Sequence, residues 1–100
     1  MLWSIFALDA ADAEQRRQEL REQHSAWLRS GSVRPVLYGP LLGPDRITPT
    51  GSLMVVEAPD RDTVLRHVDG DPFRTGGVWQ QVHVHFFAQS ARSPVQLPTA

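Results

Sequence analysis

Four segments of the chain have the composition of β-strands, being rich in aromatic and β-branched residues and bounded by Gly, Pro, Asp or Ser. They are residues 2–8, 33–42, 52–57 and 78–87. The second segment contains Pro35 and is interrupted at Gly39-Pro40. Because proline cannot donate a backbone hydrogen bond to a neighbouring strand, this segment is predicted to be an edge strand or to be bulged.

Apolar residues at spacings of three and four predict one long amphipathic helix. The stripe consists of Ala13, Arg17, Leu20, His24, Trp27 and Leu28. Asp9 or Asp12 is placed to cap the helix at its start, and the helix is predicted to run to about Ser30, with Gly31 as its stop.

A second, shorter helix is predicted to begin at Pro59-Asp60 and to end at Gly70. Asp71-Pro72 follows immediately, with the pattern of a new helix start in which Asp is the N-cap and Pro takes the first helical position. The chain therefore carries helix-forming sequence between its third and fourth strands.

The order β-α-β-β-α-β predicts an α+β fold of ferredoxin-like type, with both helices on one face of a four-stranded antiparallel sheet. On the last strand, alternation divides the side chains between two faces. One face receives Val78, Val82, Val84 and Phe86, and the other receives Trp79, Gln81, His83, His85 and Phe87. A second face with aromatic side chains is unfavourable in water, so we expect it to pack against a second copy in a homodimer.

Composition supports one folded domain and excludes several classes of partner. The chain has 100 residues, 41% of them hydrophobic and 21% charged, with a formal net charge of −1. This balance is not that of a nucleic-acid-binding protein or of a polybasic membrane anchor. No apolar run approaches the roughly 20 residues of a membrane span, and the N-terminal run lacks the basic start of a signal peptide, so a cytoplasmic location is expected.

The absence of two residue types narrows the chemistry. All ten basic residues are Arg, and there is no Cys. The side chains therefore offer neither an amine for a Schiff base nor a thiolate for nucleophilic attack or metal binding.

An ordered set of short motifs resembles the YCII-related family over residues 1–88, leaving 89–100 as a C-terminal tail. The set is MLWSIFALD at the start, His24, Arg34 with Gly39-Pro40, Gly51-Ser52, Asp71-Pro72-Phe73 and Gly77-Val78. The resemblance implies a dimeric α+β barrel with a pocket near the sheet–sheet interface. It also implies a catalytic pair, His24 and Asp71, acting without a cofactor.

One type within the family acts as a dehydrochlorinase on a chlorinated, hydroxylated aromatic. This sequence departs from the family pattern in two places. Phe86 stands where a proline is usual, and the loop between the second and third strands is short. The first departure bears on packing, whereas the second leaves the substrate class open.

Each member of the predicted pair also has an ordinary structural explanation. His24 lies in the apolar stripe, where a histidine can be buried with one hydrogen bond, or can serve as a neutral general base. Asp71 is a good N-cap by itself, yet a carboxylate has acceptor sites to spare and could also orient the imidazole.

The substrate-binding candidates are Ser52, Arg34, Tyr38 and Phe73. Ser52 begins a strand after a turn glycine and could donate its hydroxyl to a substrate oxygen. Arg34 could bind a carboxylate through two hydrogen bonds, or could be an exposed strand arginine. Tyr38 and Phe73 flank the motifs and could line the pocket or belong to the core.

No metal site is expected. His83 and His85 project to the same side of one strand, but no third Asp, Glu or Cys accompanies them. They are predicted to be surface or interface residues. His67, at the edge of the apolar face of its helix, is predicted to be solvated.

Two functional hypotheses from different classes follow. The first is a small cofactor-free enzyme that uses the His–Asp pair for proton transfer or elimination on a small aromatic or oxoacid-type molecule. The second is a non-catalytic dimeric module that binds a small ligand or a partner. A pocket that reaches the pair would favour the first hypothesis, and a sealed pair would favour the second.

Overall fold

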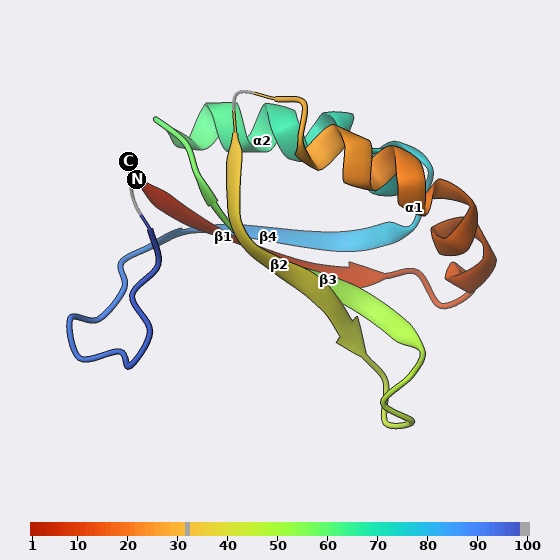
Figure 1. Cartoon of the computed structure of the whole chain (residues 1–100). Helices are drawn as coiled ribbons and strands as arrows, with labels where there is room; N and C mark the ends of the chain where they lie inside the picture. The colour runs from red at the N-terminus through yellow and green to blue at the C-terminus, as the bar shows by residue number, and fades with distance from the viewer. Residues whose placement is uncertain (32, 99–100) are drawn as a thin grey trace.

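The computed structural model describes residues 1–31 and 33–98, so the last two residues of the predicted tail lie outside the described part. The element order is β1 (Leu2–Asp9), α1 (Glu14–Leu28), β2 (Arg34–Leu42), β3 (Pro49–Glu57), α2 (Arg61–Gly70), α3 (Pro72–Thr75) and β4 (Trp79–Phe87). The strands form a four-stranded antiparallel sheet in the order β2-β3-β1-β4. All three helices cover one face of this sheet (Figure 1). The predicted ferredoxin-like fold is confirmed.

The core lies between the helices and the covered face of the sheet. Alternation along β1 sends Trp3, Ile5 and Ala7 into it, all of them buried. Across the core, Val64 of α2 and Phe73 of α3 are also almost completely buried. Among the described residues, no helix is both long and apolar enough to span a membrane.

The start and the end of α1 differ from the prediction. Its N-cap is Ala13, which forms no side-chain cap hydrogen bond. Asp9, the first predicted cap, instead receives a hydrogen bond from Arg17, with Oδ2 2.8 Å from Nε. Asp12, the second, lies 3.4 Å from Arg16. The helix ends at Leu28, earlier than predicted, because the N–H of the next residue turns back to earlier carbonyl groups instead of extending the helix.

Helix starts after β3 agree with the prediction. Asp60 is the N-cap of α2 and accepts a hydrogen bond from the backbone N–H of Thr63 at 2.8 Å. Asp71 is the N-cap of α3 and accepts from the N–H of Phe73 at 2.9 Å. The short α3 packs against α1 and holds Phe73 against His24.

The edge position of β2 is confirmed, and its pairing with β3 shifts register between Pro35 and Leu37. β3 begins at Pro49, three residues before the predicted start, because the turn ends sooner than its composition suggested. These two strands therefore form a long hairpin that extends beyond the end of β1 (Figure 1).

A bulge in β4 changes which face Trp79 occupies. Leu8 pairs with Gln81, but Asp9 pairs with Trp79, so Gln80 is an extra residue with no partner on β1. Residues opposite each other on neighbouring strands point to the same face. Trp79 consequently joins the helix-covered face, where it is buried, and the prediction that placed it with Gln81 on the other face is wrong.

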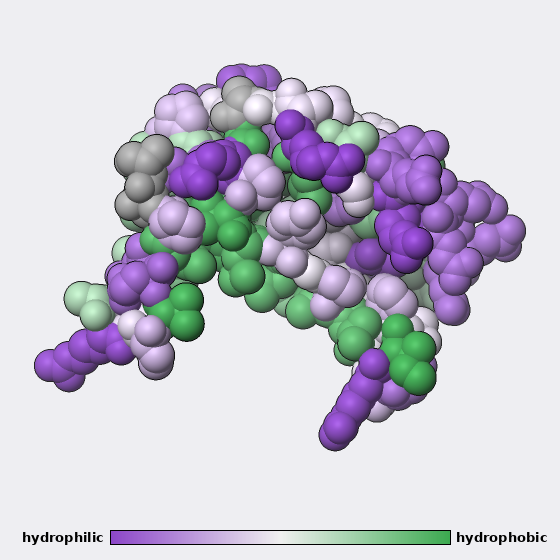
Figure 2. Space-filling view, in the orientation of Figure 1, coloured by the Kyte–Doolittle hydropathy of each residue, from purple (hydrophilic) through white to green (hydrophobic). Residues whose placement is uncertain are grey.

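The opposite face of the sheet, which we call the open face, carries exposed apolar side chains. They include Phe6, Leu8, Leu37, Leu53 and Phe87. Figure 2 shows apolar surface on the underside of the molecule, between two projecting segments, the β2–β3 hairpin and the stretch that follows β4. That stretch, residues 88–98, forms no helix or strand and returns to β2, where Arg34 donates to the carbonyl oxygen of Pro98 at 3.4 Å.

Candidate functional site

His24 and Asp71 form a buried hydrogen-bonded pair, although they are 47 positions apart in the sequence. α1 carries His24 in its middle, and Asp71 stands at the junction of α2 and α3. The imidazole Nδ1 lies 2.8 Å from each carboxylate oxygen of Asp71. Because both helices pack on the same face of the sheet, the topology brings the two residues together as the fold predicts. Asp71 is 1% exposed and still caps α3.

The pairing determines which ring nitrogen of His24 is available. An ionised carboxylate only accepts hydrogen bonds, so Nδ1 carries the proton that is shared with Asp71. In the neutral imidazole this leaves Nε2 with a free lone pair. Within the described part of the chain, Nε2 has no hydrogen-bond partner and is not one of the fully buried unpaired atoms. Nε2 is therefore the nitrogen that can accept a proton from a ligand.

Aromatic rings fix the orientation of the imidazole. Phe73 stacks on His24 with ring centroids 4.0 Å apart and an interplanar angle of 10°. Trp79 meets the same imidazole edge-on, at 5.5 Å and 81°. The ring is thus held by packing as well as by the hydrogen bond, and rigid support of this kind is typical of a functional side chain.

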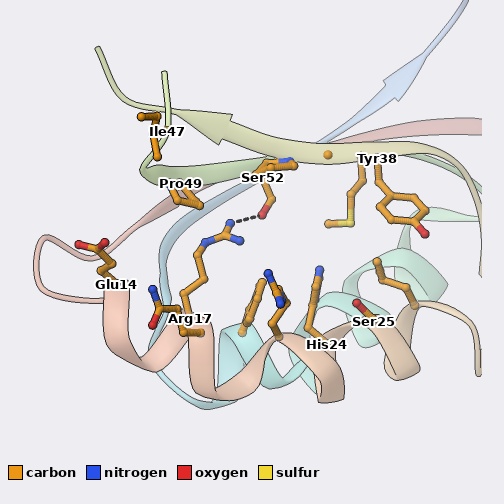
Figure 3. Close-up of a pocket in the computed structure, with 15 residues that line it drawn as sticks. Glu14, Arg17, His24, Ser25, Tyr38, Ile47, Pro49 and Ser52 are labelled. Carbon is orange, nitrogen blue, oxygen red and sulfur yellow. Dashed lines mark hydrogen bonds between the residues drawn. The ribbon is translucent and has the colours of Figure 1, made fainter. Parts of the chain in front are cut away.

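The cavity beside His24 lies between α1 and the β2–β3 hairpin and has a volume of about 400 Å³ (Figure 3). Its walls include Arg17, Arg21, His24, Tyr38, Ser52, Met54 and Phe73. It lies on the helix-covered side of the sheet, whereas the family resemblance placed a pocket near the interface between two sheets. A volume of this size suits a ligand of about one aromatic ring with substituents.

The predicted site residues are distributed unequally around this cavity. His24, Ser52, Tyr38 and Phe73 line it, and Asp71 stands behind His24 without lining it. Arg34 lies outside it, because the Arg34 guanidinium forms an ion pair with Glu57 at 3.0 Å on the neighbouring strand. The structure therefore does not place Arg34 where it could bind a substrate in this cavity.

Arg17 supplies the guanidinium that sequence reasoning assigned to Arg34. Its Nε donates to Asp9, and its Nη2 donates to the carbonyl oxygen of Gly51 and to the hydroxyl of Ser52, both at 2.6 Å (Figure 3). The carbon of the guanidinium lies 4.7 Å from the centre of the Phe73 ring. Its position on the stripe that contains His24, two turns away, was the signal that could have identified it.

Trp79 also reaches the site, through the bulge in β4. Its indole Nε1 donates to the hydroxyl of Ser52 at 3.3 Å. Alternation assigned this residue to the opposite face, so no pattern along the chain indicates this contact. Ser52 therefore accepts hydrogen bonds from Arg17 and Trp79, neither of which can accept one in return.

His67 is buried close to the pair and is not solvated as predicted. It is 7% exposed and stacks on Trp27, with ring centroids 5.6 Å apart. Burial lowers the pKa of His67 below its ordinary value of 6.5, and a positive charge on His24 lowers it further, whereas the charge of Asp71 opposes the shift. His67 is consequently a neutral residue of the core near neutral pH.

No group of three His, Cys, Asp or Glu side chains that could hold a metal ion occurs within residues 1–31 and 33–98. His83 and His85 lie opposite Phe6 and Ser4 on the open face, on the other side of the sheet from the cavity. They are not part of the candidate site.

Comparison with known proteins gives a family and a fold. The family model described as YCII-related domain matches residues 1–88. The chain is also 31% identical over 94 residues to Protein YciI of Escherichia coli O6:H1 (strain CFT073) and of Shigella flexneri. Each match covers 87% of this chain and 96% of the relative.

Among solved structures, the chain resembles 5-chloro-2-hydroxyhydroquinone dehydrochlorinase TftG of Burkholderia phenoliruptrix AC1100, in complex with 2,5-dihydroxybenzoquinone. The TM-score is 0.77 and the identity 27%, covering 90% of this chain and 96% of the other. An uncharacterized NIPSNAP domain protein of Burkholderia xenovorans gives a TM-score of 0.54 at 10% identity, over 95% of this chain and 100% of the other. At that identity the likeness concerns the fold alone.

Proposed function

The chain belongs to the YCII-related family, and from this premise we propose that it is a small enzyme in which His24 transfers a proton on a small aromatic or oxoacid-type molecule. The observation that carries the proposal is the pair itself: Nδ1 of His24 is bonded to a buried carboxylate at 2.8 Å, while the ring borders a cavity of about 400 Å³. The similarity to a dehydrochlorinase with a small ring compound bound supports the same class of chemistry.

In the proposed reaction, Nε2 of His24 accepts a proton from a C–H or O–H group of the substrate. The electron pair of the broken bond stays on the substrate, where it moves to an oxygen or expels an anionic leaving group such as chloride. The imidazole becomes a cation, and the buried carboxylate of Asp71 stabilises that cation at a fixed hydrogen-bond distance. The base and its partner come from the chain's own side chains.

The other lining residues are assigned to substrate binding. Phe73, which is almost completely buried, belongs to the wall of the cavity and supports the ring of His24, and Ser52 presents a hydroxyl to a substrate oxygen. Tyr38, which is 55% exposed, stands on β2 across the cavity from His24, at its rim (Figure 3). Arg34 has no role in this proposal.

We also propose that the working form is a homodimer that buries the open face. Its exposed apolar residues lie on all four strands of one sheet, so a second copy related by a twofold axis could cover them all at once. Because the cavity lies on the other side of the sheet, each chain would keep its own site.

The test compares the wild-type protein with His24→Gln on two probes. Release of chloride from 5-chloro-2-hydroxyhydroquinone measures elimination, and deuterium incorporation into the methyl group of pyruvate in D₂O measures proton abstraction beside a carbonyl. We expect at least one process to be faster with the wild-type protein by about 10²–10⁴-fold, the range for a general base.

Equal rates for the two proteins on both probes would contradict the proposal. If the wild-type protein then bound 2,5-dihydroxybenzoquinone without converting either probe, the non-catalytic ligand-binding module would be the better description. Thermal unfolding of His24→Gln accompanies the assay, because the ring is packed against Phe73 and its loss lowers stability as well.

A further inference from the structure

Two hydrogen-bond donors that the protein leaves unused border the cavity near His24. The first belongs to Arg17. Arg17 has five N–H groups. The one on Nε donates to Asp9, and those on Nη2 donate to the carbonyl oxygen of Gly51 and the hydroxyl of Ser52. Nη1 has no partner in the part of the chain that the structure describes, and it is not among the fully buried unpaired atoms. Because Arg17 lines the cavity, its Nη1 is available to a ligand.

The second donor is the hydroxyl hydrogen of Ser52. The oxygen already accepts from Arg17 at 2.6 Å and from Trp79 at 3.3 Å, and neither of these groups can accept a hydrogen bond. The hydroxyl must therefore direct its own hydrogen elsewhere, and within residues 1–31 and 33–98 no acceptor receives it. Ser52 also lines the cavity, so this hydrogen is available to the same ligand.

We infer that Arg17 and Ser52 form a subsite for one negatively charged oxygen of the substrate. The substrate class is then an enol, phenol or oxoacid whose oxygen carries negative charge when bound or gains it as His24 removes the proton. His24 and Arg17 both contact Phe73 and both line the same cavity, so one small molecule in that cavity can reach the base and the subsite. This inference rests on the proposed function only for the position of the transferred proton.

The subsite is preorganised for an anion. Asp9 and the carbonyl oxygen of Gly51 hold the guanidinium in one orientation before any ligand enters, so no side-chain rearrangement opposes binding. Among the described residues that line the cavity, Arg17 and Arg21 are cations and Glu14 is a carboxylate. Asp9 pairs with Arg17 and Glu14 offsets Arg21, so an anion is attracted by the unused donor of Arg17 and not by a net positive charge of the cavity.

The test measures binding of 2,5-dihydroxybenzoquinone by titration calorimetry at pH 7, where its acidic hydroxyls are ionised. Hydroquinone, a neutral ring of similar size, is the comparison ligand. The variants are Arg17→Lys, which keeps the charge but loses the planar set of donors, and Ser52→Ala, which removes one donor. Arg16→Lys is the matched control, because the neighbouring Arg16 donates to the carbonyl oxygen of Gly77 and does not line the cavity.

We expect Arg17→Lys and Ser52→Ala each to weaken binding of the anion by about tenfold or more, as the loss of a hydrogen bond to a charged group does. The dissociation constant of Arg16→Lys for the anion should stay within about twofold of the wild-type value. Binding of hydroquinone should change little in any variant. Thermal unfolding identifies a variant that fails to fold. If Arg17→Lys fails to fold, Ser52→Ala still tests the subsite.

The same titration separates this inference from the proposed function. His24→Gln should still bind the anion while losing proton transfer. Anion binding that is unaffected by Arg17→Lys and Ser52→Ala, or absent from the wild-type protein, would overturn the subsite even if His24 proved to be a base. Conversely, a wild-type protein that binds the anion through Arg17 and Ser52 but transfers no proton would retain the subsite and lose the enzyme.

Discussion

At the scale of single residues, Asp71 holds two structures in place with one carboxylate. It accepts from the N–H of Phe73 at the start of α3 and from Nδ1 of His24 in α1. The cap alone explains why an aspartate precedes Pro72, since Asp and Asn are both strong N-caps. Only the contact with His24 requires a charge, so the two functions can be separated by substitution.

We predict that Asp71→Asn keeps the fold but impairs proton transfer. The amide oxygen can still cap α3, so the free energy of unfolding should fall by no more than about 1–2 kcal/mol. Loss of the carboxylate removes the partner that fixes the tautomer and stabilises the imidazolium, so the rate should fall by about 10²–10⁴-fold. Urea unfolding and ¹⁵N NMR of the imidazole measure the two effects.

Asp69→Asn is the matched control for that experiment, because Asp69 is exposed and lies two residues before Asp71, near the end of α2. It should leave both the tautomer and the rate as in the wild-type protein. An Asp71→Asn protein with an unchanged rate would show that the carboxylate is needed for structure only.

The lowered pKa of His67 leads to a prediction about how folding stability depends on pH. In the unfolded chain it titrates near its ordinary pKa of 6.5, whereas burial lowers the pKa in the folded protein. Between these two values the unfolded state binds more protons, so stability rises with pH there. The contribution of neutral, buried His67 to folding stability is fully present above pH 6.5. It is lost as the pH falls from 6.5 through the pKa of His67 in the folded protein.

We therefore expect His67→Phe to lose less stability than the wild-type protein when the pH is lowered from 7.5 to 5, since phenylalanine can keep the stacking on Trp27 but cannot be protonated. Urea unfolding at the two pH values gives the comparison. Equal losses in both proteins would mean that His67 titrates alike in the folded and unfolded states.

Some residues of the site can be predicted from the sequence and others cannot, for a physical reason. The fold brings His24 and Asp71 together, because it puts their helices on one face of the sheet. Arg34 was the predicted cation of the site, and Arg17 was named only as a member of the stripe on the first helix. In the folded chain Arg17 forms an ion pair with Asp9, and Arg34 forms one with Glu57. These pairings depend on how the helix and the strands pack together, which the sequence pattern does not specify.

At the scale of elements, composition predicted every strand of the sheet but could not predict the bulge in β4. Trp79 and Gln81 stand two apart in the sequence, and simple alternation puts them on one face. The extra residue at Gln80 breaks that rule, and the register of β1 against β4 reveals it only in the folded chain. The predicted cap of α1 was wrong for a similar reason, because Asp9 and Asp12 form ion pairs with Arg17 and Arg16 instead of capping the helix.

The pairing of β1 with β3 depends on a glycine. A Cβ atom at Gly51 would clash with the backbone carbonyl oxygen of Ala7, because it would lie closer than van der Waals contact allows. That oxygen cannot move without disturbing the sheet. We predict that Gly51→Ala lowers the free energy of unfolding by about 2–3 kcal/mol. It should also weaken binding of an anion, since the carbonyl oxygen of Gly51 orients Arg17.

Gly39→Ala on β2 is the control, because a Cβ atom there meets nothing within 4 Å. Its effect should be within about 0.5 kcal/mol. Urea unfolding of the two variants at one protein concentration tests the difference. Similar losses at the two positions would show that loss of flexibility, and not the close approach of the strands, determines the cost.

At the scale of the whole molecule, the open face makes a prediction about assembly. Leu53 lies near the centre of that face, between Phe6 on β1 and the open-face side of β2. We expect light scattering to give twice the mass of the chain for the wild-type protein at micromolar concentration. Leu53→Arg should give the mass of one chain, because a charge buried in an apolar interface has no partner.

Val95→Arg is the matched control, since Val95 is 69% exposed in the segment after β4 and not on the open face. It should keep the mass of the wild-type protein. A wild-type protein with the mass of one chain would contradict the homodimer and would leave the cavity and its residues unaffected.

If the proposed site and the proposed homodimer both hold, the two faces of the single-layered sheet serve different tasks, and neighbours in the sequence belong to different tasks. On β3, Ser52 and Met54 border the cavity while Leu53 faces away from it, and on β2 Tyr38 follows Leu37 in the same manner. Natural variation can therefore alter the ligand at one position and the contact between copies at the next, with little conflict between them. The extra residue in β4 lets Trp79 and Gln81, which stand two apart in the sequence, serve opposite faces of the sheet, and a deletion of Gln80 would leave each of them on its present face.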